Sequence, residues 1–357
     1  MNGLLCYCRA GFEPDLAAEL GDRAAEAGIA GYARASRGDG YVLFLGDDAA
    51  IATGLPWRSL VFARQALPLF AELRGLDPRD RMGPMLEAIE AAMPRGVSGS
   101  RPYGALWVEH PDSDAGKPLS GLARSFANAL RPALRKRRLL TPAEDPALPR
   151  LHVCFLAGDH VLLASADPAI TSPWPLGVPR LKLHADAPSR SALKLEEALL
   201  VLLDPAQRAE LLRPGMTAAD LGAAPGGWTW VLARQGLRVI AIDNGPLRAH
   251  LFDTGLVEHL REDGFRWQPP RPLDWMVCDM VEQPSRVARR MGDWFREGWC
   301  RQSIFNLKLP MKKRWLETRR SLDAFVEAAA VPVEVRARQL YHDREEITVL
   351  ARRMARA

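Results

Sequence analysis

The stretch Asp220-Leu221-Gly222-Ala223-Ala224-Pro225-Gly226-Gly227-Trp228 determines how the second half of the chain folds. A short apolar segment precedes it, and residues 229–234 are expected to open a helix. A strand, a glycine-rich turn and a helix in this order let the backbone approach a nucleotide-like ligand closely, because a Cβ would fill the ligand's space. The turn is neither the dinucleotide G-x-G-x-x-G motif nor a phosphate-binding G-x-x-x-x-G-K-[ST] loop.

Strand and helix patterns alternate on both sides of this turn. Strands are predicted at residues 218–221, 238–242, 273–278, 303–309, 333–338 and 347–352, and helices at 190–203, 228–235, 286–300 and 313–329. This alternation predicts an α/β domain at 189–357, a mostly parallel Rossmann-like sheet with helices on both faces. The short link between the last two strands favours an antiparallel final strand.

The first half of the chain has a different pattern. A strand at 3–9, an amphipathic helix with Phe12, Leu16, Leu20 and Ala24 on one face, and a strand at 41–45 predict an α+β module of ferredoxin-like type at 1–54. A second module is expected at 55–166. Five prolines lie between residues 167 and 188, which is typical of a semi-rigid linker and places a domain boundary there.

The densest basic zone of this half includes Lys117, Arg124, Arg131 and the run Arg135 to Arg138. Such a zone suits contact with nucleic-acid phosphates. It is equally typical of a solvated helix end, where cations favour the helix dipole.

Composition narrows the class of protein. The 357 residues carry a net charge of +5, which suits a polyanionic partner without requiring one. No apolar run approaches the roughly 18 residues of a transmembrane helix, and the N-terminus has no secretory pattern. Five cysteines without a C-x-x-C pair argue against a disulfide framework or a zinc ribbon and for a reducing cytoplasm. No dimerisation stripe is evident, so a monomer is expected.

Several carboxylates follow predicted strands, where ligands bind in open α/β sheets. Asp220 and Asp279 end two of these strands, and Asp243 follows a third, where a carboxylate meets ribose hydroxyls. Asp263 is placed to lie near an adenine. Each acid taken alone could instead be a helix cap or a loop carboxylate.

Two lysines stand among apolar residues. Lys308 lies in the strand Ile304 to Leu309, directly before Pro310, and Lys194 lies in a helix. A buried ammonium is costly unless it is paired, so these lysines are expected to have acidic partners. Glu346 opens the last strand, although its neighbour Glu345 could take the same place.

The segment Ser189-Arg190-Ser191-Ala192-Leu193-Lys194-Leu195, the glycine turn, Asp279, Lys308 and Glu346 together resemble the FtsJ-type ribose 2′-O-methyltransferases. The resemblance implies a catalytic tetrad of Lys194, Asp279, Lys308 and Glu346. It also implies that S-adenosyl-L-methionine (SAM) is contacted by Ser189, Ala224, Pro225, Gly226, Gly227, Asp243, Asp263 and Asp279. No metal is implied.

The resemblance extends through the first half, where residues 110–138 are similar to a THUMP RNA-binding domain. It therefore implies methylation of a ribose 2′-hydroxyl, on a specific cytidine of 23S ribosomal RNA, with naked or partly assembled RNA as the better substrate. A lysine can act as a base only when it has lost its proton, which burial and a second ammonium favour. Lys308 is the expected proton acceptor.

Other functions are weighed against this one. The residues after the strand at 273–278, Asp279-Met280-Val281-Glu282, are not the Asn/Asp-Pro-Pro-Tyr/Phe loop of amine methylation. Cys278 precedes Asp279 but its strand position favours a buried side chain, not a nucleophile. A small-molecule O-methyltransferase would need no basic first half. A non-catalytic RNA-binding or assembly factor would bind RNA without consuming SAM.

Overall fold

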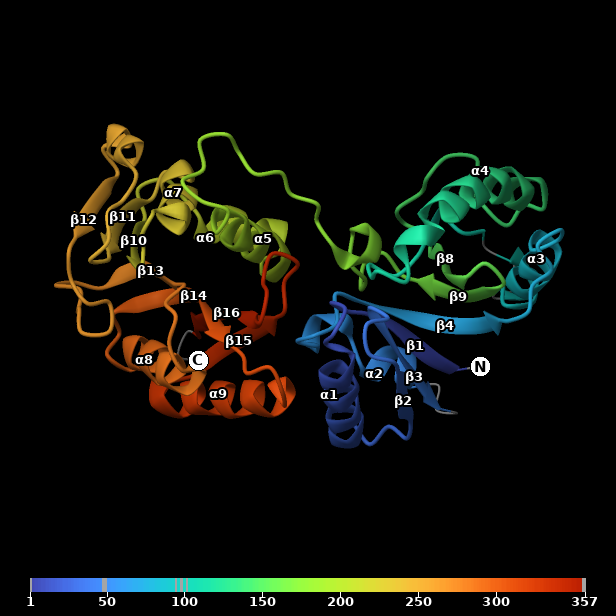
Figure 1. Cartoon of the computed structure of the whole chain (residues 1–357), viewed down its shortest axis with the longest axis horizontal. Coiled ribbons are helices and arrows are strands. Elements are labelled where there is room, and N and C mark those ends of the chain that lie inside the picture. Colours follow the sequence, from blue (N-terminus) through green and yellow to red (C-terminus); the bar gives the residue numbers. More distant parts are fainter. Residues whose placement is uncertain (1, 47–49, 94, 97–98, 101, 355–357) are drawn as a thin grey trace. The chain divides into compact units, whose positions relative to one another are not determined.

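The computed structural model describes residues 2–46, 50–93, 95–96, 99–100 and 102–354 (Figure 1). The chain divides into two compact units, Met1–Pro179 and Arg180–Ala357. Within the described residues, no helix combines the length and apolar composition needed to cross a bilayer.

Unit 1 is built on a seven-stranded sheet with the order β2-β3-β1-β4-β9-β8-β7. The strands are β1 (Asn2–Tyr7), β2 (Tyr32–Ala35), β3 (Tyr41–Gly46), β4 (Gln65–Leu73), β7 (Ala105–Glu109), β8 (Arg150–Ala157) and β9 (His160–Ala166). Two short strands, β5 (Arg95–Gly96) and β6 (Gly99–Ser100), pair with each other. Because β4 pairs with both β1 and β9, a single sheet joins β1, β2 and β3 to β7, β8 and β9.

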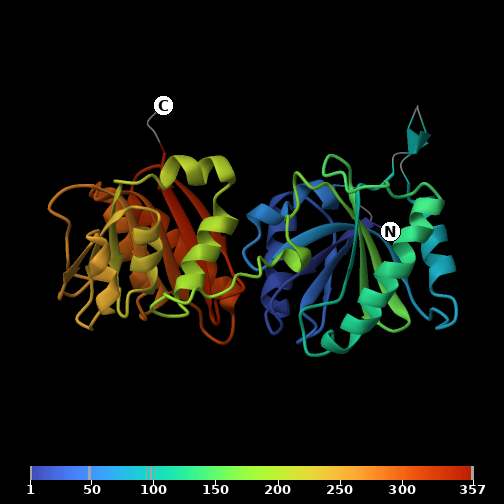
Figure 2. The ribbon, with the colours of Figure 1, turned by 90° about the horizontal axis from the view of Figure 1, so that it is seen from above.

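The helices of unit 1 cover this sheet in two groups. They are α1 (Glu13–Glu26), α2 (Ile51–Gly54), α3 (Met82–Ala91) and α4 (Ser120–Lys136), with short 3-10 turns η1 (Trp57–Ser59), η2 (Lys117–Leu119) and η3 (Pro175–Gly177). α1 packs against β2 and β3, whereas α4 packs against β7. Figure 2 shows α4 lying across its sheet. The four apolar residues predicted to share one face of the first helix, Phe12, Leu16, Leu20 and Ala24, are all buried.

The chain that leaves β9 stays attached to unit 1 through buried hydrogen bonds. Ser172 and the Gln65 side chain exchange two, of 3.0 and 3.3 Å, and the Leu176 amide donates to Glu109 at 2.8 Å. Gly177 then turns the chain with φ of +73°. A Cβ at this glycine would fall far inside van der Waals distance of the Arg64 carbonyl oxygen. The first part of the proline-rich stretch is therefore held against the sheet.

Replacing Gly177 with alanine should destabilise unit 1 by roughly 2–4 kcal/mol, because the new Cβ adds a clash to a strained backbone. Gly28 is the matched control: its φ is +69° but nothing lies within 4 Å of an added Cβ. Gly28→Ala should cost about 1 kcal/mol, the strain alone. Native-state hydrogen exchange of the β8 and β9 amides measures the loss of unfolding free energy in each variant. Equal losses in the two variants would contradict the proposed anchoring of this segment.

Unit 2 contains a second seven-stranded sheet, of order β12-β11-β10-β13-β14-β16-β15. The strands are β10 (Thr217–Leu221), β11 (Arg238–Ile242), β12 (Val257–Leu260), β13 (Leu273–Cys278), β14 (Cys300–Lys308), β15 (Val333–Arg338) and β16 (Glu346–Arg353). The pairs from β12 to β14 are parallel. β16 runs antiparallel to both β14 and β15, which confirms the predicted antiparallel final strand.

Helices cover both faces of this sheet, as predicted (Figure 1). α5 (Ala192–Leu202), α6 (Pro205–Leu211) and α7 (Gly227–Arg234) lie on one face, and α8 (Pro284–Arg296) and α9 (Arg314–Ala329) on the other. A further 3-10 turn, η4 (Ala249–Thr254), precedes β12. α8 buries Val287, Ala288, Met291, Trp294 and Phe295, whose spacing matches one helical face.

The helix predicted at 286–300 corresponds to α8, and the prediction that it continues to Cys300 is wrong. The helix ends at Arg296, because Gly298 takes φ of +71° and Cys300 already begins β14.

Candidate active site

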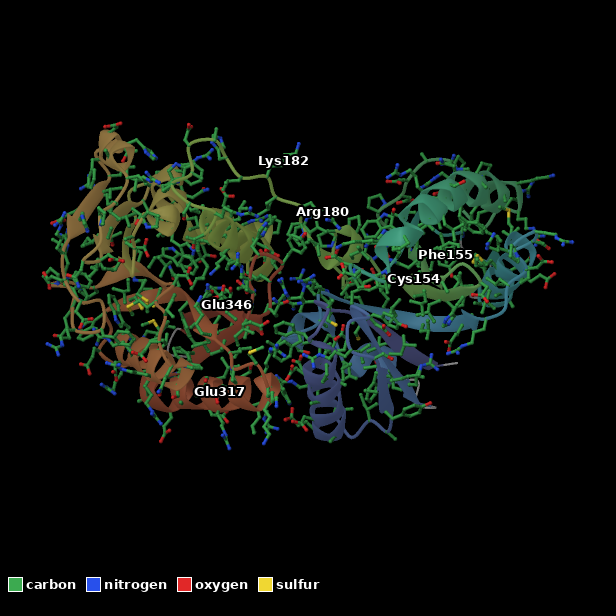
Figure 3. The ribbon with its side chains drawn as sticks, viewed as in Figure 1. Cys154, Phe155, Arg180, Lys182, Glu317 and Glu346 are labelled. Atoms are coloured by element: carbon green, nitrogen blue, oxygen red, sulfur yellow. The ribbon has the colours of Figure 1, made fainter. Side chains whose placement is uncertain are left out.

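Two lysines and two acids from four elements meet at the carboxyl edge of the sheet in unit 2. Lys194 of α5 lies 3.2 Å from Asp279 Oδ2 and 2.5 Å from Glu346 Oε1. Lys308, at the end of β14, lies 3.5 Å from Asp279 Oδ1 and donates a short hydrogen bond to Glu346. Each acid therefore contacts both lysines, and the four side chains form one cluster. Figure 3 marks Glu346 among the side chains of unit 2.

Strand register explains why these residues meet. Lys308 and Glu346 are directly opposed in the antiparallel pair of β14 and β16. Asp279 follows β13, which is the parallel neighbour of β14. Glu345, the alternative to Glu346, points elsewhere and pairs with Arg314 at 2.6 Å.

The electrostatics of the cluster fix two of its charges. Burial favours the neutral form of Lys194, but Asp279 and Glu346 outweigh it and raise the pKa of this lysine. Burial likewise opposes ionisation of Asp279, yet Lys194 and Lys308 hold its pKa below the ordinary value. Lys194 is consequently an ammonium and Asp279 a carboxylate throughout the neutral range.

Two polar residues outside the predicted site residues, Ser191 and Asn306, support Asp279. Ser191 donates to Asp279 Oδ2 at 2.9 Å, and the Asn306 amide donates to Oδ1 at 2.9 Å. Thr348 in turn donates to Asn306 Oδ1 at 2.8 Å, which sets the orientation of the amide. An asparagine among the apolar residues of a predicted strand is the sequence signal that could have revealed this role, and the structure shows that Asn306 is fully buried.

A third acid lies behind the cluster. Asp343 is fully buried, and burial together with the nearby Glu346 raises its pKa well above the ordinary value. It lies 3.0 Å from the Thr348 hydroxyl. The Thr348 hydroxyl thus lies between Asp343 and Asn306, so hydrogen bonds connect Asp343 through Thr348 and Asn306 to Asp279.

The glycine turn has a polar group suited to a ligand. Gly227 begins α7 next to Ser189, and a Cβ at Gly227 would lie 2.6 Å from Ser189 Oγ. That hydroxyl is buried, and no hydrogen-bond partner for it exists among the described residues. A buried hydroxyl without a partner is costly, so a polar group of a bound molecule would satisfy it. Gly226, at φ of +110°, turns the backbone here.

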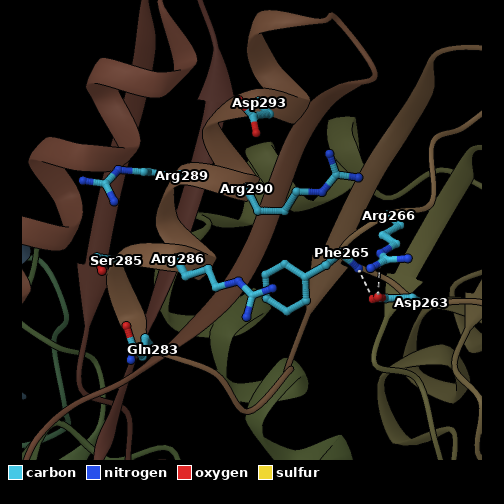
Figure 4. Close-up of a pocket in the computed structure, with 9 residues that line it drawn as sticks. All are labelled: Asp263, Phe265, Arg266, Gln283, Ser285, Arg286, Arg289, Arg290 and Asp293. Carbon is cyan, nitrogen blue, oxygen red and sulfur yellow. Dashed lines mark hydrogen bonds and ion pairs between the residues drawn. The ribbon is translucent and has the colours of Figure 1, made fainter.

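Asp243 and Asp263 lie on neighbouring loops of the same edge. The Asp243 carboxylate accepts the Ala224 amide at 2.9 Å and the Gly245 amide at 2.7 Å, which holds it against the glycine turn beside Pro225. Asp263 accepts the Phe265 amide at 2.8 Å and is half exposed. It borders a pocket of about 580 Å³ whose lining includes four arginines (Figure 4). These two acids are separate from the lysine cluster.

Cys278 has no chemical role at this edge. Its thiol is fully buried at the end of β13, and burial raises its pKa to about 12. The thiolate needed for nucleophilic attack is therefore not formed near neutral pH.

Asp220 is also buried, near the end of β10, and its carboxylate accepts a 2.6 Å hydrogen bond from the Thr229 hydroxyl. Burial raises its pKa to about 7.

A doubly wound sheet, a glycine turn at the first strand and a cluster of lysines and acids at the same edge define a Rossmann-fold methyltransferase domain. Residues 187–299 match the FtsJ-like methyltransferase family. Residues 1–67 match the RlmM ferredoxin-like domain, and residues 80–166 the N-terminal domain of ribosomal RNA large subunit methyltransferase M.

Full-length relatives give the particular family. Ribosomal RNA large subunit methyltransferase M of Xanthomonas oryzae pv. oryzae and that of Xanthomonas campestris pv. campestris are each 68% identical over 354 residues, covering 99% of this chain and 100% of the relative. The chain belongs to the ribosomal RNA large subunit methyltransferase M family. Its cofactor is SAM, the methyl donor of this class.

Replacing Asp220 with asparagine should change how stability depends on pH. Unfolded Asp220 loses its proton near pH 4, whereas the folded form keeps it until about pH 7. Between these values the native state binds more protons, so wild-type stability falls by up to about 1.4 kcal/mol per pH unit and levels off above pH 7. The asparagine variant lacks this titration and therefore this pH-dependent loss of stability. Its stability relative to wild type should therefore rise from pH 4.5 to 7.5 in urea denaturation without cofactor, and a constant difference would contradict the assignment.

Proposed function

We propose that the protein transfers a methyl group from SAM to the ribose 2′-hydroxyl of a specific cytidine in 23S ribosomal RNA, with Lys308 as the proton acceptor. The relatives are named as methyltransferases of large-subunit ribosomal RNA, which supports the substrate class. The proposal that the modified nucleotide is a cytidine is based on the family resemblance. The observation that bears most directly on the ribose is the cluster of Lys194, Asp279, Lys308 and Glu346.

A ribose hydroxyl is a weak acid, so an enzyme that methylates it must position the oxygen and receive its proton. Lys308 is the better placed lysine for this step. Its side chain is 29% exposed, compared with 16% for Lys194, so a substrate reaches it more easily. Lys194 is held as an ammonium by both acids and supplies a fixed positive charge. When Lys308 takes the proton from the oxygen, Glu346 and Asp279 are in place to stabilise the ammonium formed.

The cofactor fits the glycine turn on chemical grounds. SAM supplies an activated sulfonium methyl group when bound, so no metal is needed. We propose that Ser189 and the backbone of Ala224, Pro225, Gly226 and Gly227 hold its amino-acid end. Asp243 would accept the ribose hydroxyls, Asp263 would lie at the adenine, and Asp279 would contact the donor while it orients the lysines.

The RNA is proposed to be held by unit 1 through a THUMP-like surface on α4. Lys136, the last residue of this helix, and Arg138, two residues after it, are exposed, and neither side chain has an ion-pair partner in the described part of the chain. By comparison, Arg137 pairs with Glu90 at 3.0 Å. Unpaired surface cations release counterions on binding phosphates, which favours RNA contact. A target ribose must be accessible, so naked or partly assembled ribosomal RNA is the expected substrate.

Lys308→Ala should lower methyl transfer to unmethylated 23S ribosomal RNA by at least about 100-fold, the usual contribution of a general base. SAM binding, measured by calorimetry, should remain within about threefold of wild type, because the glycine turn is untouched. Lys182→Ala removes an exposed lysine that precedes α5 and is the control, with turnover expected within a few fold. Near-normal turnover of Lys308→Ala would refute the assignment of the proton acceptor.

The double variant Lys136→Ala/Arg138→Ala should bind the same RNA more weakly and with a shallower salt dependence. Losing two phosphate contacts should reduce the slope of log affinity against log salt by up to about 2. The control Arg37→Ala/Arg58→Ala removes equal charge from exposed positions outside α4. If both variants change the slope equally, α4 has no specific role.

A further inference from the structure

Two apolar side chains stand unusually far into solvent beside the lysine cluster. Val281 is 83% exposed and Met311 is 77% exposed, the two highest values among the large hydrophobic residues of the described part of the chain. Val281 comes two residues after Asp279, and Met311 three residues after Lys308. The length of an extended chain limits the Cα–Cα distance to about 7 Å between Val281 and Asp279 and to about 11 Å between Met311 and Lys308. Each residue therefore lies within a few residues of a member of the lysine cluster, in a loop at the same edge of the sheet.

Residues next to Val281 and Met311 are held in place by the fold. Met280 packs over two glycines, since a Cβ at Gly222 would lie 2.6 Å from its Cγ and one at Gly264 3.1 Å from its Sδ. The next residue, Val281, is left facing outward.

The Met311 loop is fixed at both ends by one acid. The Leu309 amide donates to the Glu345 carbonyl at 2.7 Å, and Arg314 pairs with the Glu345 carboxylate at 2.6 Å. Only residues 310–313 extend beyond these contacts. Their exposure is thus built into the fold, and burying an apolar side chain of this kind on binding is favourable.

We propose that Val281 and Met311 contact the unstacked nucleobase of the nucleotide being methylated and so orient its ribose toward Lys308. This inference rests on the proposed function. The base is covalently attached to the ribose that must reach Lys308, and its faces are the apolar surface an RNA offers at that point. Lys312 and Lys313, both exposed, follow Met311 and suit the adjoining phosphate. Glu282, the acid directly after Val281, is paired with Arg286 at 2.7 Å.

The test uses near-isosteric polar substitutions in the full-length protein. Val281→Thr/Met311→Gln should lower kcat/KM for naked, unmethylated 23S ribosomal RNA about tenfold, mainly through KM, because the apolar contact with the base is lost. Affinity for SAM and the melting temperature should stay at wild-type values. The matched control Val326→Thr/Met354→Gln makes the same changes at exposed positions on α9 and after β16, and should have no effect.

A second variant separates contact with the base from support of the fold. Val281→Ile/Met311→Leu keeps the apolar surface and should retain wild-type kinetics. The inference is overturned if the polar double variant behaves like the control, or if the apolar double variant loses as much as the polar one. Nucleoside mass spectrometry of wild-type product is run in parallel. A methyl group found on a base and not on the 2′-oxygen would instead overturn the proposed function, whatever the variants do.

Discussion

The direct opposition of Lys308 and Glu346 across two antiparallel strands is the constraint on which the site depends. A purely parallel sheet would place the last residue of β14 and the first residue of β16 at opposite edges. Because β16 runs backward between β14 and β15, its first residue meets the last residue of β14. Asp279 and Lys194 then complete the cluster from the next strand and from a covering helix. Each acid contacts both lysines, which lowers the cost of placing four ionisable groups together.

Much of unit 2 could be predicted, because its signals are local. The glycine turn, the apolar strands and the lysine at the end of an apolar run all appear as short patterns. The proximity of Lys194 to Glu346 could not be derived from such patterns, since 152 positions separate them in the sequence, and it came from family resemblance. Ser191 and Asn306 were missed for a related reason: their hydrogen bonds to Asp279 exist only once the sheet is assembled.

The structure differs from the sequence predictions at two further places, the helix α6 and the proline-rich stretch. The helix α6 was not predicted, although Asp204 and Gln207 form a capping box and Pro205 stands at its first turn. In unit 1, composition suggested that residues 167–188 form a linker, but composition cannot show that Gln65 and Glu109 hold residues 172 and 176 against the sheet. Hydrogen bonds to backbone amides leave no trace in the local sequence.

The most direct test of the account is the distance between Lys308 Nζ and the acceptor 2′-oxygen in a crystal structure with S-adenosylhomocysteine and a bound RNA. The account expects hydrogen-bond distance, about 2.6–3.2 Å, with Lys194, Asp279 and Glu346 still in contact around it. A 2′-oxygen that lies out of reach of Lys308, or a nucleobase atom in its place beside the methyl donor, would contradict it.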